Sequence, residues 1–124
     1  MPTDTPLWRQ FRRLLLGAVV EAILPTGIDL DVRTLVITFD DASAFRVPRL
    51  DNYMRFRGTV RGVLRAPVDA ATRARLLAGL RAVWPEIVSV VDLPIGDALT
   101  VEKSDVQVDI EGDTLVIRFD LSAD

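Results

Sequence analysis

The chain has 124 residues, of which 49% are hydrophobic and 27% charged, a composition typical of one globular domain with its own core. It contains no histidine and no cysteine, which excludes disulfides, Cys/His zinc sites, thiol nucleophiles and histidine general bases. Fifteen basic and eighteen acidic residues give a net charge of −3, which argues against nucleic acid as a partner.

The first predicted element is an amphipathic helix over residues 5–24. Thr5 is a suitable N-cap, and Pro6 suits the first helical position, where its missing amide hydrogen costs nothing. Pro25 and Gly27 end the helix. Apolar residues recur at helical spacing and form one stripe, which comprises Leu7, Trp8, Phe11, Leu14, Leu15, Val19 and Ile23.

Three further residues, Leu16, Val20 and Leu24, widen this stripe beyond what covering one sheet face requires. We therefore expect them to form an oligomer interface. Two alternatives stay open. The helix covers a large sheet, or it lies on an anionic membrane surface through the basic residues near its start, Arg9, Arg12 and Arg13.

The apolar run after these arginines is too short for an export signal or a membrane span. Glu21 interrupts it, and no small-x-small cleavage pattern follows. We therefore expect no transmembrane segment and a cytoplasmic location, with envelope association as the alternative.

Two β elements are predicted next. Alternation of apolar and polar residues over 28–39 predicts a β-hairpin, and residues 40–52 are typical of a loop. Residues 53–65 carry the clearest strand pattern, with apolar or small residues on one face. The candidate binding residues lie on the opposite face, and they are Tyr53, Arg55, Arg57, Arg61 and Arg65.

The second half of the chain predicts a helix, a strand and a hairpin. The helix spans residues 69–84, with Asp69 as its N-cap and Pro85 as its end. Residues 86–93 are apolar enough for a central strand. Residues 105–120 predict a hairpin with a two-residue Gly-Asp turn. Its predicted cross-strand pairs are Ile110 with Leu115, Val108 with Ile117, and Val106 with Phe119.

Together these elements predict the α+β class: one domain over residues 1–124 with two helices packed on a mixed sheet of about six strands. The two predicted hairpins are similar, since segments 28–40 and 108–120 are identical at seven of thirteen positions. An internal duplication explains this similarity. The alternative is that any two amphipathic hairpins share the same restrictions on residue type.

The arginine-bearing strand predicts a binding surface. Same-face positions of a strand lie roughly 7 Å apart. Guanidinium groups at that spacing suit phosphates, lipid headgroups or an acidic partner. In the alternative interpretation the face is only solvated, and its arginines pair across the sheet with Asp29, Asp31, Asp109 or Glu111. Single-stranded nucleic acid is disfavoured, because no aromatic residue beyond Tyr53 is interleaved with the arginines.

Catalysis is not predicted. The sequence lacks a phosphate-binding loop, a Walker pattern and a nucleophile elbow. The aspartates at positions 40, 41, 92 and 97 are typical turn formers, so we expect no metal site and no cofactor. An enzyme that uses paired carboxylates is the remaining alternative.

One segment is similar to a known family. The stretch Phe56-Arg57-Gly58-Thr59-Val60, the Arg/Ala/Leu-rich helix over 70–84 and the run from Ile87 to Leu93 together resemble the BON domain, a small bacterial module associated with phospholipids or the envelope. The resemblance covers about a third of the chain and implies a βαβ unit with a binding or assembly role. Pro85-Glu86 departs from the Gly-Val that the family usually has there.

Two functional hypotheses follow. The first is a non-catalytic binding or assembly module that acts through the arginine face, with a protein partner, self-association or, as an alternative, anionic lipid. The second is a structural subunit of a homo-oligomer or of a larger particle, such as a phage tail or injection machine.

Overall fold

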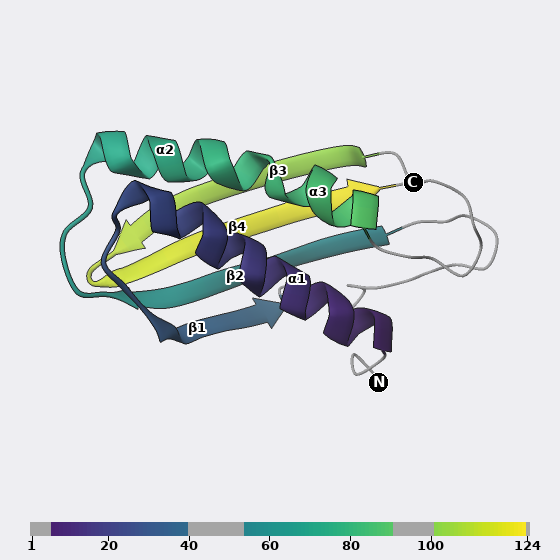
Figure 1. The fold of residues 1–124 in the computed structure, drawn as a ribbon, viewed down its shortest axis with the longest axis horizontal. Coiled ribbons are helices and arrows are strands. Elements are labelled where there is room, and N and C mark those ends of the chain that lie inside the picture. Colours follow the sequence, from purple (N-terminus) through teal and green to yellow (C-terminus); the bar gives the residue numbers. More distant parts are fainter. Residues whose placement is uncertain (1–5, 40–53, 91–100, 124) are drawn as a thin grey trace.

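The structure is a computed structural model that describes residues 6–39, 54–90 and 101–123. In chain order its elements are α1 (Pro6–Ile23), the 3-10 turn η1 (Leu24–Thr26), β1 (Leu30–Phe39), β2 (Met54–Leu64), α2 (Ala70–Arg81), α3 (Val83–Val90), β3 (Val101–Glu111) and β4 (Thr114–Ala123). Figure 1 shows the helices together on one face of the sheet, with α2 and α3 over β3 and β4 and with α1 crossing toward β1.

The predicted sheet of about six mixed strands is wrong. Within the described ranges there are four strands in the order β1-β2-β4-β3, and every neighbouring pair is antiparallel. Two of the predicted strands do not occur. The segment predicted as a strand over 86–93 is helical where it is described, and the segment predicted as a hairpin over 28–39 is one strand.

The predicted strand over 86–93 is helical where it is described, as α3. Pro85 does not stop a helix here. It is the third residue of α3, in the first turn, where a missing amide hydrogen removes no helical bond. The buried residues Val83, Trp84, Ile87 and Val88 recur at helical spacing. The apolar run alone did not distinguish a buried strand from a short buried helix.

The predicted hairpin over 28–39 is one strand, β1, whose pairing with β2 shifts between Asp31 and Val36. Side chains support this irregularity. The Thr34 hydroxyl accepts a hydrogen bond from the Val63 amide at 2.8 Å and donates one to the Asp31 carbonyl at 2.6 Å. The polar residues within the segment therefore build a β-bulge and not a chain reversal.

Glycine explains why the two similar segments differ. At the turn of the C-terminal hairpin Gly112 has a φ of 65°, and the residue aligned with it in the first segment is Val32. A β-branched residue strongly disfavours this conformation. The first segment therefore does not close a hairpin, and the internal duplication stays a hypothesis about descent.

Several predicted elements are confirmed. The N-terminal helix, the arginine-bearing strand and the second helix occur as α1, β2 and α2. The C-terminal hairpin has the predicted turn. Its three predicted pairs are also present, namely Ile110 with Leu115, Val108 with Ile117, and Val106 with Phe119.

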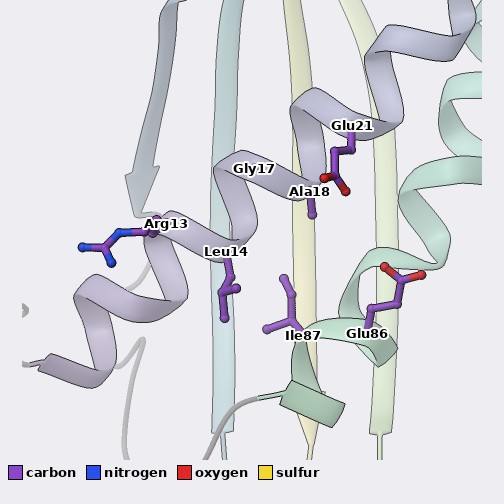
Figure 2. A pocket seen from close by; sticks show the side chains of 7 residues that line it. All are labelled: Arg13, Leu14, Gly17, Ala18, Glu21, Glu86 and Ile87. Carbon is purple, nitrogen blue, oxygen red and sulfur yellow. The ribbon is translucent and has the colours of Figure 1, made fainter.

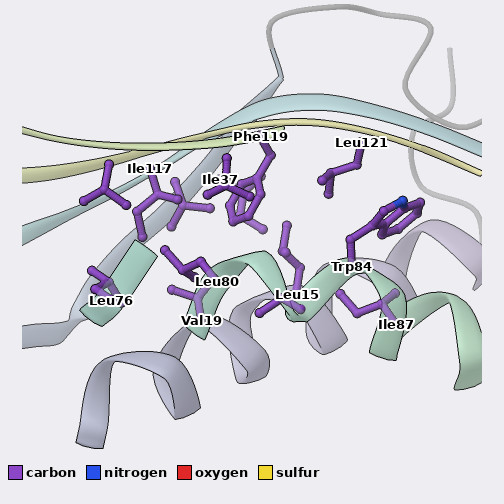
Figure 3. Close-up of a cluster of buried hydrophobic side chains, with 14 of the residues drawn as sticks. Leu15, Val19, Ile37, Leu76, Leu80, Trp84, Ile87, Ile117, Phe119 and Leu121 are labelled. Atoms are coloured by element: carbon purple, nitrogen blue, oxygen red, sulfur yellow. The ribbon is translucent and has the colours of Figure 1, made fainter. Parts of the chain in front are cut away.

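The core lies between the sheet and the helices, as Figure 3 shows. Leu15 and Val19 of α1, Leu76 and Leu80 of α2, and Trp84 and Ile87 of α3 point toward Ile37, Ile117, Phe119 and Leu121 of the sheet. The Trp84 indole N–H donates to the Ser122 carbonyl at 2.9 Å and so ties α3 to β4. One face of the sheet is thereby covered, and the other carries the polar side chains.

Asp69 gives a pH-dependent contribution to stability. Its carboxylate accepts a hydrogen bond from the Thr72 amide at 2.7 Å, and hydrogen bonds from the side chain and backbone of Thr72 hold the pKa of Asp69 below 3.8. A lowered pKa stabilises the folded state above the unfolded pKa, and this contribution is lost as the pH falls through the folded value.

We therefore expect Asp69→Asn to lower the melting temperature at neutral pH by a small amount, because asparagine keeps the capping acceptor but loses the charge. The difference should shrink as the pH falls through the lowered pKa of Asp69, since Asp69 itself then becomes protonated. Thermal unfolding of both proteins across this range measures the effect. A constant difference at every pH would contradict the assignment.

Candidate binding surface on the open sheet face

The open face of the sheet points away from the helices, and no described element covers it (Figure 1). The antiparallel register arranges its side chains in rows across the strands. One row contains Val36, Arg61, Val116 and Asp109. Two rows away, toward the start of β2, lie Arg57, Asp120 and Asp105. The predicted arginine face is therefore one part of a four-stranded surface.

The β3–β4 half of this face is neutralised by its own ion pairs. Arg118 lies 2.7 Å from Asp109 and 3.1 Å from Glu111, and Lys103 lies 2.8 Å from Asp120. The hydrogen bond to Asp120 raises the pKa of Lys103. These contacts satisfy the two basic groups within the sheet.

Arg118 also explains a buried side chain on this polar face. Its guanidinium reaches two rows along the sheet to Glu111, and the row between them holds Val116. Val116 is fully buried although it does not belong to the core under the helices, and we attribute its burial to the stem of Arg118. The β3–β4 half is thus closed by its own side chains.

The β2 arginines differ from one another. Arg65 lies 3.6 Å from Asp29 and 3.5 Å from Asp31, so for this residue the solvated-face interpretation holds. The same Asp31 accepts a hydrogen bond from the Arg33 side chain, which lowers the pKa of Asp31. Arg65 is therefore already engaged at the bulged start of β1.

Arg57 and Arg61 are exposed, and within the described ranges neither takes part in an ion pair. Arg61 donates one hydrogen bond, to the Thr38 hydroxyl at 3.0 Å. Two valines beside them are also solvent-exposed, Val36 by 52% and Val63 by 39%. We call Arg57, Arg61, Val36 and Val63 the β1–β2 patch.

Two predicted site residues cannot be placed in this patch. Tyr53 lies outside the described residues. Arg55 belongs to β2 and is in register with Ser122, but its side chain is not among those described. Sequence reasoning missed the two valines, although the alternation along residues 28–39 placed Val36 on the polar side of its strand.

The predicted oligomer interface is only in part exposed. Leu16 and Val20 are half-buried on α1, and Leu24, which lies in η1 just after that helix, is 69% exposed. Leu16 packs against the core, so only part of its side chain is available to a partner.

A separate hollow of about 260 Å³ lies between α1 and α3 (Figure 2). Leu14, Ala18 and Ile87 form its apolar floor, and the carboxylates of Glu21 and Glu86 stand at one end. Arg13 points away from it. Sequence reasoning did not find this hollow, although the small pair Gly17-Ala18 in α1 was a signal for it.

Metal and membrane features were also sought in the described residues. No three acidic side chains there lie close enough to hold a metal ion, and the aspartates at 40, 41, 92 and 97 lie outside the described ranges. None of the described helices has the length and apolar character needed to cross a membrane.

Comparisons of the chain with family models, with curated proteins and with solved structures found no match. The resemblance to the BON domain therefore stays an expectation from the sequence, and functional argument starts from the surface itself.

Proposed function

We propose that the protein is a non-catalytic binding module that takes an acidic protein segment on the β1–β2 patch. The observation that carries the proposal is the contrast between the two halves of the open face. Arg118 and Lys103 are neutralised within the sheet, whereas Arg57 and Arg61 are exposed beside exposed valines. Cations next to apolar surface suit a partner that brings carboxylates together with apolar side chains.

A narrow acidic segment fits this face better than an anionic membrane. The described outward side chains include four basic residues, Arg57, Arg61, Lys103 and Arg118, and four acidic residues, Asp105, Asp109, Glu111 and Asp120. A flat membrane would meet both sets at once and find no net positive charge. A segment that binds beside Val36 lies next to Arg61, which takes part in no ion pair within the described ranges.

A labelled peptide with the sequence acetyl-Glu-Val-Glu-Val-Glu-Val-Glu-amide is a suitable probe, measured by fluorescence anisotropy at low salt. We expect the double substitution Arg57→Glu with Arg61→Glu to weaken its binding by about tenfold or more, since each exposed ion pair contributes up to about 1 kcal/mol and reversal adds repulsion. Salt should weaken the wild-type binding in the same direction.

The matched control is Arg73→Glu with Arg81→Glu, because both arginines are exposed on α2 and the net charge changes by the same amount. This control should leave the affinity nearly unchanged. Equal losses in both double variants would show that net charge alone attracts the peptide and would overturn the proposal. So would tighter binding to anionic vesicles than to the peptide.

A structural subunit is the second candidate function, and the observation that favours it is the strongly exposed Leu24 next to half-buried Leu16 and Val20. In that case the protein forms an oligomer that survives high salt, and Leu16→Asp or Val20→Asp dissociates it. Light scattering after size exclusion measures the mass. A wild-type monomer of 13.7 kDa would exclude this function.

A further inference from the structure

The two edges of the sheet are unlike each other. The β3 edge carries five charged residues along its length, Glu102, Lys103, Asp105, Asp109 and Glu111. Charges of this kind protect an edge against pairing with another strand. The β1 edge has two charged residues, Asp31 and Arg33, both before its regular section, and it exposes Val32 by 49% and Val36 by 52%; among the described elements only β2 pairs with it. The β1 edge is therefore the one open to strand addition.

The regular part of this edge is Val36 to Phe39, after the bulge. In an antiparallel ladder every second residue directs its N–H and C=O groups away from the neighbouring strand. Even this short section therefore offers backbone donors and acceptors to an added strand.

The flank of α1 provides a cover for such a strand. Gly79 of α2 lies against Ala22, and Leu14 and Ala18 face Ile87 of α3, so α2 and α3 occupy one side of α1. Because successive residues of an α-helix are rotated by about 100° about its axis, Leu16 and Val20 lie on the opposite side of α1. That side faces the β1 end of the sheet, and because α1 lies above β1 near Arg13 and above the inner strands near Gly17 and Ala18, Leu16 is nearer to β1 than Val20 is (Figure 2).

We propose that the acidic segment binds as an additional β-strand along β1, which rests on the function proposed above and specifies the conformation of its partner. In a strand, successive side chains point to opposite faces. Acidic residues at alternate positions then lie on the open face with Arg61, and the apolar residues between them lie on the covered face, on the side of Leu16.

The spacing of the strands permits these contacts. An added strand lies about 4.8 Å from β1 and roughly 10 Å from β2. Arg61 is in register with Val36, so the added residue beside Val36 is the one whose carboxylate faces Arg61 across that gap. A glutamate and an arginine side chain together span this distance. The partner is thus an extended segment with alternating acidic and apolar residues.

Backbone methylation of the peptide tests this conformation without altering the protein. Two versions of the Glu-Val peptide carry N-methyl groups, one on the glutamates and one on the valines. Strand addition predicts that one version loses about tenfold or more in affinity, because its methyl groups block the hydrogen bonds to β1, while the other version binds nearly as well as the parent. Equal binding of both versions, or an equal loss in both, would overturn strand addition.

A second measurement tests the cover beneath α1. Leu16→Ala should weaken the Glu-Val peptide several-fold but leave a Glu-Ser peptide of the same length unaffected, since only valine has an apolar contact to lose. The same loss for both peptides would contradict the predicted position of the strand.

These results separate the two proposals. If Arg57→Glu with Arg61→Glu abolishes binding while both methylated peptides bind equally, the acidic-segment function holds and strand addition fails. If the double variant has no effect, the proposed function fails. A salt-resistant dimer that does not bind the peptide would overturn the strand proposal.

Discussion

Replacing Trp84 by alanine is expected to destabilise the protein by about 3–5 kcal/mol. Trp84 is fully buried and is the largest side chain in the core, where it lies between α3 and the sheet (Figure 3). Its loss also leaves the Ser122 carbonyl without the indole donor. Because the stability of a domain is commonly about 5–15 kcal/mol, a large fraction of the total is at stake.

Denaturant unfolding followed by far-UV circular dichroism measures this effect, and Trp84→Phe is the informative companion. Phenylalanine fills much of the volume but donates no hydrogen bond, so its cost should be clearly smaller than that of alanine. A cost below about 1 kcal/mol for the alanine variant would show that α3 contributes little to the fold.

The second large effect is expected at Gly58, where alanine should cost about 1–3 kcal/mol or more through overpacking. A Cβ atom at this position would lie 2.5 Å from the ring of Phe56 and 2.8 Å from the Thr38 carbonyl oxygen. The ring cannot move aside easily, because Phe56 is fully buried and packs against Phe119 at a centroid distance of 6.3 Å. The backbone oxygen belongs to the neighbouring strand and is held by the ladder.

Gly17→Ala is the matched control for this substitution. Gly17 is exposed on α1, and a Cβ there would meet nothing within 4 Å. Alanine in a helix interior should raise stability by up to about 1 kcal/mol. The two glycine variants should therefore shift the unfolding midpoint in opposite directions, and a shift in the same direction would contradict the packing described around Gly58.

The sequence predicted correctly those elements whose residue pattern is compatible with only one secondary structure. A glycine at the tip of an alternating hairpin fixed both the turn and the register of β3 with β4, and Asp69 marked the start of α2. The two errors arose where the residue pattern is compatible with two different structures. The valine-rich run of α3 is apolar enough for a strand or a buried helix turn, and the polar residues of β1 suit a bulge as well as a reversal.

For the candidate site, the sequence predicted which residues share a face but not which of them are neutralised. The arginines of β2 look equivalent along the strand, yet Arg65 meets Asp29 and Asp31 while Arg57 and Arg61 do not. Likewise, Asp109 and Glu111 were candidates to neutralise the β2 arginines, and they pair with Arg118 of β4 instead. These choices depend on strand order, which no local pattern in β2 contains.

The position of β4 between β2 and β3 bears on how the protein is made. While the ribosome synthesises the chain, α2, α3 and β3 emerge before the strand that connects them to β2. Until β4 follows, β1 and β2 form at most a two-stranded ribbon, which is marginal in water. The sheet is therefore completed only once β4 has emerged, and until then the nascent chain presents apolar strand surface of the kind that chaperones bind.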